Sequence, residues 1–259
     1  MSFLRSLYRH AVEKSKYAAA FIAKNNPPAK FIIFAQGRTG TNLLRDLLNS
    51  HPKIHCDGEL LKHKKIFLKS FLEIRRLFFK TKAYGFKVKI YQLTKKQKIH
   101  NPKQIMSDLH RRGWKIIYLK RRNLFCHAVS TIAMEHRRKE RFLRRSYTRW
   151  FKDCPISIGK IHINCTDLIK KMKYRENLLA QEETILHGLP HMQLVYEDNL
   201  LKSQDHQNTA NRIFGYLNLP FFPVTTQRTK KVPERLSDLI DNFEEIANAV
   251  GKTRYAKFL

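Results

Sequence analysis

Hydrophobic and polar positions divide this chain into short apolar runs of strand length and longer segments with helical spacing. The runs at 30–35, 53–57, 84–93, 114–119 and 192–197 predict five strands. The cores of the first and fourth runs, "IIF" and "IIY", are apolar throughout, which is typical of strands buried on both faces of a sheet.

Helical spacing fills the gaps between these strands. The predicted helices are 41–50, 64–79, 102–112, 124–138, 166–187, 204–217 and 236–249. Alternation of strands and helices predicts an α/β, P-loop-like three-layer fold, with a five-stranded, mostly parallel sheet flanked by helices. The alternating segment 156–164, centred on Gly159, predicts a small hairpin. Ligands of such sheets bind beyond the carboxyl ends of the strands.

The segment "FAQGRTGTNLL" joins the first strand to the first helix of the sheet. Gly37 and Gly40 allow a tight turn and a close approach of backbone, and Thr41 begins a helix whose free amides can hold a phosphate. An ATP-binding loop would need lysine after the last glycine, but Thr41 and Asn42 stand there. Arg38 instead offers a permanent charge that suits phosphate or sulfate oxygens.

A second basic turn follows the fourth strand, in "YLKRRNLFCHAVS". Arg122 lies where the strand ends, and Ser130 follows eight residues later, about two helical turns on. This spacing allows the guanidinium and the hydroxyl to converge on one phosphate. A solvated turn formed by Arg121 and Arg122 is the structural alternative.

Together the two motifs resemble those of sulfotransferases that use 3'-phosphoadenosine 5'-phosphosulfate (PAPS). The resemblance extends over about residues 31–200, and a looser likeness at the C-terminus indicates the branch acting on carbohydrates and bacterial, nodulation-factor-like glycolipids. It implies that the 5'-phosphosulfate is held by Arg38, Thr39, Gly40, Thr41 and Asn42, and the 3'-phosphate by Arg122 and Ser130. The strand ending in "YED" resembles the family's adenine contact, which would be Tyr196.

The resemblance also implies a catalytic base just after the second strand, and Glu59 in "HCDGELL" stands there. Asp57 is the alternative base, and His51 and His55 are weaker ones. Many members of the family carry lysine where this chain has Arg38, which cannot donate a proton and would stabilise charge instead.

The chain of 259 residues has 51 Lys and Arg against 21 Asp and Glu, a formal net charge of +30. Such an excess predicts anionic partners. We expect a sulfuryl transfer from PAPS, leaving PAP, to a hydroxyl of a carbohydrate or glycolipid acceptor, with no metal and no specific nucleic acid. The alternatives are a nucleotide kinase-like phosphoryl transferase with a degenerate phosphate loop, and a non-catalytic basic module that binds polyanions or nucleic acid.

Two basic regions remain open. Residues 1–26 form a predicted amphipathic helical extension, either packed on the domain at 27–259 or in peripheral contact with anionic membrane. Residues 136–152 interleave basic and aromatic side chains and are either a solvated helix face or a docking surface for acidic glycan, membrane headgroups or nucleic acid. Lys87 and Lys89 project to one side of the third strand, toward either sulfate and acceptor or solvent. The absence of a long apolar run predicts a cytoplasmic protein.

Overall fold

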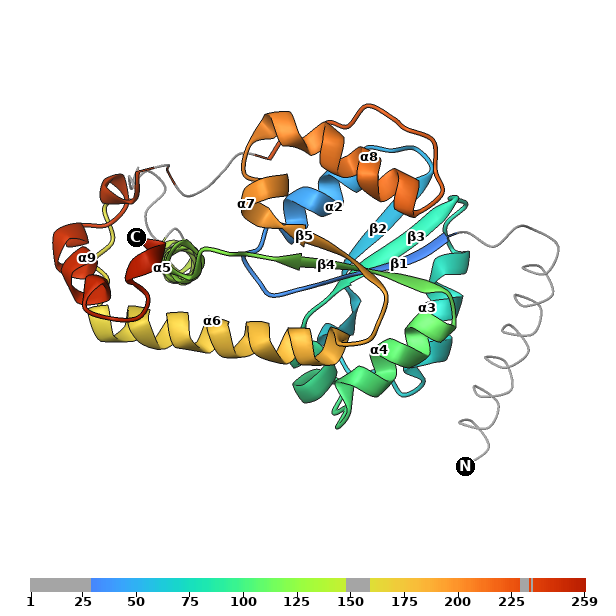
Figure 1. Ribbon diagram of the computed structural model, residues 1–259, viewed down its shortest axis with the longest axis horizontal. Helices are drawn as coiled ribbons and strands as arrows, with labels where there is room; N and C mark the ends of the chain where they lie inside the picture. Colours follow the sequence, from blue (N-terminus) through green and yellow to red (C-terminus); the bar gives the residue numbers. More distant parts are fainter. Residues whose placement is uncertain (1–28, 148–158, 229–232, 234) are drawn as a thin grey trace.

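The structure is a computed structural model, and it describes residues 29–147, 159–228, 233 and 235–259. Within these ranges the chain forms a three-layer α/β fold around one five-stranded sheet (Figure 1). The predicted fold class is therefore confirmed. The predicted extension at 1–26 and residues 148–152 of the basic stretch lie outside the described residues.

The sheet has the strand order β2-β3-β1-β4-β5, and all of its strand pairs are parallel. Its strands are β1 (Ala29–Ala35), β2 (Ile54–Glu59), β3 (Ala83–Val88), β4 (Trp114–Lys120) and β5 (His191–Val195). β1 lies at the centre, where its residues Phe31 to Ala35 are almost fully buried, as the apolar run predicts.

Helices cover both faces of the sheet (Figure 1). On one face lie α2 (Thr41–Asn49) and α8 (His206–Tyr216), which pack on alternate residues of β1 such as Phe31 and Ile33. On the other face lie α3 (Leu68–Leu77), α4 (Pro102–Arg111) and the end of α6 (Cys165–Leu186), against Ile32 and Phe34. The alternation of side chains along β1 thus supplies two separate cores.

A third apolar cluster lies beyond the carboxyl ends of the strands. It joins α5 (Leu124–Tyr147) to α6 and α9 (Phe243–Gly251), and it includes Ile161 and Ile240, which form an isolated parallel bridge. This bridge corrects the predicted hairpin over the residues that the structure describes, because Gly159 to Asn164 contain no strand and Ile161 pairs with Ile240 instead. A bridge to a segment so distant in the sequence has no local signal.

Short helices occupy several remaining connections. They are the 3-10 turns Leu60–Lys62, Ser203–Asp205, Leu236–Asp238 and Ala256–Phe258, the π-helix Gln92–Lys96 and α7 (Tyr196–Asn199). The prediction of a strand over 84–93 was wrong at its end, since β3 stops at Val88. The Lys89 amide there donates to the side chain of Gln92 at 3.0 Å rather than to a neighbouring strand.

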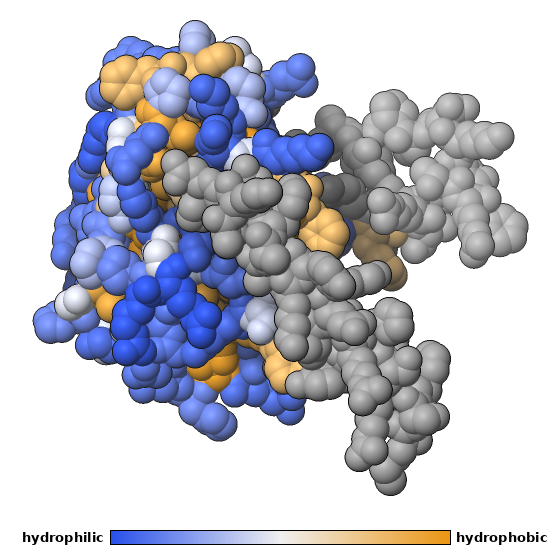
Figure 2. Space-filling model, turned by 90° about the vertical axis from the view of Figure 1, so that its right-hand side faces the viewer, coloured by the Kyte–Doolittle hydropathy of each residue, from blue (hydrophilic) through white to orange (hydrophobic). Residues whose placement is uncertain are grey.

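Sequence signals explain several helix ends. The side chain of Asn101 caps α4 by accepting from the Gln104 amide, Pro102 stands at its first turn, and Gly113 follows it with φ 85°. Figure 2 shows one face of the molecule, on which hydrophilic residues predominate over small apolar groups. None of the helices in the described ranges combines the length and the apolar character that crossing a bilayer requires.

Candidate functional site

The loop between β1 and α2 has the backbone of an anion-binding turn. Arg38 and Gly40 both adopt left-handed conformations, with φ 71° and 85°. No side chain caps α2, so its first amides keep their donors free for a ligand. The Thr39 hydroxyl donates to the carbonyl of Gln36 at 2.9 Å and so closes the turn from inside.

Gly40 is required at its position for two reasons. Its φ of 85° disfavours any side chain, and a Cβ there would lie 2.7 Å from Cδ2 of Tyr196. Tyr196 begins α7 directly after β5, and its ring lies 4.8 Å from the Arg121 guanidinium. The predicted adenine contact is therefore adjacent to the predicted phosphate loop.

Arg38 connects the two motifs. Its Nε donates to Oγ of Ser130 at 3.1 Å, across 92 positions of sequence, and its carbonyl accepts from Arg121. Burial, together with the nearby charges of Arg121, Arg137 and Arg138, lowers the pKa of Arg38. This crowding of like charges around a largely buried guanidinium favours an anionic ligand at the loop.

Arg122 and Ser130, which are predicted to hold one phosphate together, have different partners in this structure. The Arg122 side chain is 61% exposed and forms an ion pair with Asp198, while its backbone amide donates to Glu197 at 2.9 Å. Ser130 is buried on α5 and contacts Arg38. Both residues lie at the same end of the sheet, but each has its own partner.

A backbone irregularity separates the two candidate bases. Asp57 pairs in register with Phe86, whereas Glu59 pairs with the next residue, Lys87, so the bulge at Gly58 turns Glu59 to the opposite face of the sheet. Without the bulge, Asp57 and Glu59 would lie on the same face, because side chains two residues apart in a strand point to the same side of the sheet. The bulge directs Glu59, and not Asp57, toward the loop and α2.

The carboxylate of Glu59 is held at both oxygens. Oε1 lies 2.8 Å from Nζ of Lys89, and Oε2 accepts from the Gln92 amide at 2.9 Å. Burial acts to raise the pKa of Glu59, but the hydrogen bond and charge of Lys89, with Lys87 and Lys62, outweigh it and lower the pKa. The group is thus an ionised acceptor at neutral pH.

Asp57 is engaged elsewhere. It accepts from the Tyr84 hydroxyl at 2.7 Å and from Arg75 at 3.0 Å, and it contacts His55 at 3.3 Å. The ring of His55 is stacked on Phe79. These contacts hold Asp57 and His55 on the face away from the loop.

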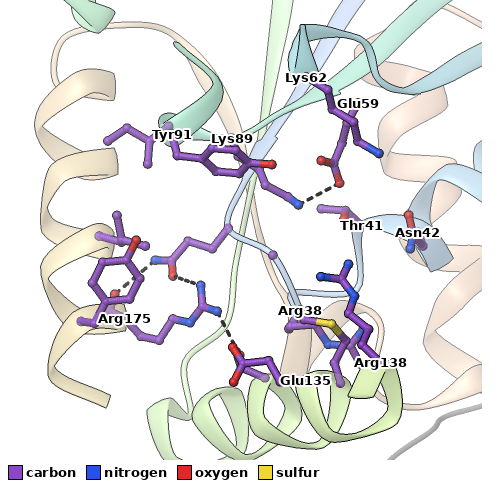
Figure 3. Close-up of a pocket in the computed structure, with 17 residues that line it drawn as sticks. Arg38, Thr41, Asn42, Glu59, Lys62, Lys89, Tyr91, Glu135, Arg138 and Arg175 are labelled. Atoms are coloured by element: carbon purple, nitrogen blue, oxygen red, sulfur yellow. Dashed lines mark hydrogen bonds and ion pairs between the residues drawn. The ribbon is translucent and has the colours of Figure 1, made fainter. Parts of the chain in front are cut away.

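A cavity of about 420 Å³ opens beside the loop. Arg38, Thr41, Asn42 and Glu59 from the predicted site line it (Figure 3). Thr39, Gly40, Arg122, Ser130 and Tyr196 are not among the residues that line it. The predicted catalytic pair, Arg38 and Glu59, therefore shares one cavity with part of the predicted phosphosulfate loop, while the residues assigned to the 3'-phosphate and to adenine do not line it.

Lys87 and Lys89 both lie on the side of the loop. Lys87 is buried and donates to the side chain of Asn42, and burial followed by the charge of Arg45 lowers its pKa to about 8. Lys89 lines the cavity, with Nζ 3.6 Å from the position of a Cβ on Gly37. Of the two orientations left open by the sequence, the one toward the loop is observed.

Three residues beside the candidate site were not assigned to it from the sequence. Arg121 contacts both Arg38 and Tyr196, whereas the 3'-phosphate was assigned from the sequence to its neighbour Arg122. Nε2 of His127 donates to the Gly37 carbonyl at 2.7 Å, and burial lowers the pKa of this ring to about 3, so it is neutral. Arg175 reaches the cavity from α6, and no local motif marks it.

Among the described residues there is no group of three or more His, Cys, Asp or Glu side chains that could hold a metal ion. The thiols of Cys56 and Cys165 are not in disulfides.

No protein-family model matches the chain, and no curated protein matches it. Among solved structures it is similar to a sulfotransferase from Alicyclobacillus acidocaldarius, with 15% sequence identity and a TM-score of 0.47, over 90% of this chain and 95% of that one. At this degree of likeness, the function of the present chain has to be inferred from its own residues.

Proposed function

We propose that this chain is a PAPS-dependent sulfotransferase that acts on a hydroxyl of a carbohydrate or glycolipid. The observation that carries the proposal is the contact between Arg38 and Ser130, which joins the loop after β1 to the helix after β4. Beside this contact lies a cavity that also contains an ionised carboxylate, Glu59. Two anion-binding elements and a base are what sulfuryl transfer requires.

The donor would lie along the carboxyl ends of β1, β4 and β5. The amides at the start of α2 and the Arg38 guanidinium fit a phosphosulfate, and the space between Gly40 and Tyr196 admits no side chain. Ser130 and Arg122 would hold the 3'-phosphate, for which Arg122 would exchange its ion pair with Asp198. That pair is exposed, and exposed pairs contribute only about 0–1 kcal/mol, so the exchange costs little.

The chemistry would be an in-line displacement. The acceptor oxygen forms a bond to sulfur, the bond from sulfur to the phosphate oxygen breaks with its electrons going to the phosphate, and Glu59 takes the hydroxyl proton. Arg38 and the amides of α2 would stabilise the charge on the leaving phosphate. Lys89 lies between the base and the loop, because its Nζ forms an ion pair with Glu59 and also lies close to Gly37.

The carbohydrate or glycolipid assignment is supported by the composition of the cavity. Its walls present tyrosine rings from Tyr91 and Tyr174 together with charged groups, a combination that can pack against a sugar ring and bind its polar substituents. The size of about 420 Å³ admits a sugar unit without enclosing a long chain.

The test is a thermal-shift comparison of PAP with ADP, ATP and single-stranded DNA. PAP should stabilise the fold more than ADP, since only PAP offers a 3'-phosphate. Arg122→Ala should weaken PAP binding by about 1.5–3 kcal/mol, the range for a charge-assisted hydrogen bond, and leave ADP binding nearly unchanged. Equal shifts for PAP and ADP would refute the proposal. A preference for ATP would favour a phosphoryl transferase.

A further inference from the structure

The cavity beside the loop is lined by more cationic side chains than are assigned to the donor. Its cationic lining residues are Arg38, Lys62, Lys89, Arg138 and Arg175, and its acidic ones are Glu59 and Glu135. Glu59 is paired with Lys89, and Glu135 is paired at 2.9 Å with Lys171, which is outside the lining. Once Arg38 is assigned to the donor, Lys62, Arg138 and Arg175 remain.

Arg175 is the most informative of these, because it is partly buried and lacks a carboxylate partner in the described residues. Its Nη1 donates to Oε1 of Gln36 at 3.3 Å and its Nη2 to Oγ1 of Thr131 at 2.9 Å, both neutral acceptors. Burial lowers the pKa of Arg175. A guanidinium has five N–H groups, so donors remain for a group in the cavity.

Neither nearby carboxyl group forms an ion pair with Arg175, and although the charges of Glu135 and Glu182 act to raise its pKa, burial outweighs them and lowers it. Glu135 forms its salt bridge with Lys171. Glu182 is almost fully buried and accepts from Gln36 at 3.4 Å, and burial raises its pKa to about 8, so it is mostly protonated at neutral pH. A partly buried charge that forms no ion pair is costly, and an anionic ligand in contact with it would reduce that cost.

The position of Arg175 assigns this ligand to the acceptor rather than to the donor. The residues proposed for the 3'-phosphate and adenine, Arg122, Ser130 and Tyr196, do not line the cavity. In Figure 3 Arg175 lies on the wall formed by α6, away from Asn42 and from the pair formed by Glu59 and Lys89. A group bound there would be separate from the transferred sulfuryl group.

We propose that the acceptor is an acidic sugar chain whose carboxylate or sulfate group binds Arg175, while a neighbouring hydroxyl faces Glu59. The proposal rests on the proposed function for the identity of the cavity as the acceptor site. Gln36 and Thr131 orient the guanidinium, and the Tyr174 ring beside it offers an apolar face for a sugar. Arg138 and Lys62 add further positive charge to the lining of the same cavity.

The test uses PAP-loaded protein and a matched pair of probes: a hexasaccharide of alternating N-acetylglucosamine and glucuronic acid, and the same hexasaccharide with its carboxylates reduced to alcohols. Calorimetry at 0.15 M salt should give tighter binding of the acidic probe. Arg175→Gln should weaken that binding by about 10- to 100-fold, as for the loss of a charge-assisted hydrogen bond, and Arg175→Lys should weaken it less.

The control is Lys173→Gln, which removes an exposed cation of the same helix that does not line the cavity. It should leave binding of the acidic probe within about twofold of the wild type, because its charge is screened. Equal binding of the two probes, or equal losses in the two glutamine variants, would overturn the inference. The thermal shift with PAP, measured on the same variants, reports separately on the fold and on the donor site.

Discussion

Replacement of Glu59 by glutamine isolates the proposed base, because the amide keeps the size of the side chain but cannot take up a proton. Its oxygen can still accept from Lys89, whereas its NH2 group would face the Gln92 amide that now donates to Oε2. Gln92 cannot simply rotate, since its own oxygen accepts from the Lys89 backbone amide. The stability loss is therefore about one hydrogen bond, roughly 1 kcal/mol, or a fall in Tm of about 2–4 °C.

The loss of rate should be far larger. General-base catalysis contributes about 10²- to 10⁴-fold, so turnover of PAPS with a panel of glycans and glycolipids should fall by that factor in Glu59→Gln while the affinity for PAP is unchanged. In the wild type, the lowered pKa of Glu59 places the acid limb of the pH profile for kcat/KM below the ordinary glutamate value.

Asp57→Asn is the matched control, which should lower stability more than Glu59→Gln does but leave the turnover rate nearly unchanged. It weakens contacts to Arg75 and Tyr84 and should cost about 1–2 kcal/mol of stability, at the lower end for charge-assisted bonds because Arg75 is 36% exposed. Its turnover should be nearly normal. Normal turnover in Glu59→Gln with a dead Asp57→Asn would refute the assignment of the base, and activity in both variants would move the role to another group such as His55.

Three further predictions follow from the loop, the buried carboxyl group and the net charge. Gly40→Ala should lose about 1–3 kcal/mol in urea melts and most of the PAP thermal shift, because the new Cβ meets Tyr196; an unchanged shift would contradict the close approach. Glu182 has its pKa raised from 4.5 to about 8 by burial, so its contribution to stability is full below pH 4.5 and is lost as the pH rises through 8. Glu182→Gln should therefore flatten the decline of Tm over that range, and an identical decline would show that another group causes it. Binding of single-stranded DNA should weaken steeply with salt and show little sequence preference, whereas tight, selective binding at 0.15 M salt would favour the nucleic-acid alternative.

The sequence alone predicts the order of strands and helices, because the spacing of apolar positions and the residues that begin or end a helix are local features of the chain. The apolar runs around Ile32 and Ile117 fixed the central strands, and glycine at position 113 fixed a helix end. Gly40 likewise marked the loop, because glycine readily adopts the left-handed conformation that is observed there.

The tertiary structure alone decided which of these residues meet. The bulge at Gly58 places Glu59 and Asp57 on opposite faces, and no spacing rule for strands predicts this, because two residues apart would ordinarily share a face. Lys89 follows the end of β3 at Val88 and forms an ion pair with Glu59 at the end of the neighbouring strand β2.

Contacts between segments that are distant in the sequence also depend on the tertiary structure. Arg38 meets Ser130 because β1 and β4 are neighbours in the sheet, and Arg175 meets Gln36 because α6 packs beyond their carboxyl ends. The partners lie 92 and 139 positions apart, so their pairing depends on strand order and helix packing. The sequence therefore specified the loop after β1 and the residues that suit it to bind an anion, whereas the packing of the layers decided which charges surround it and which of them form no ion pair.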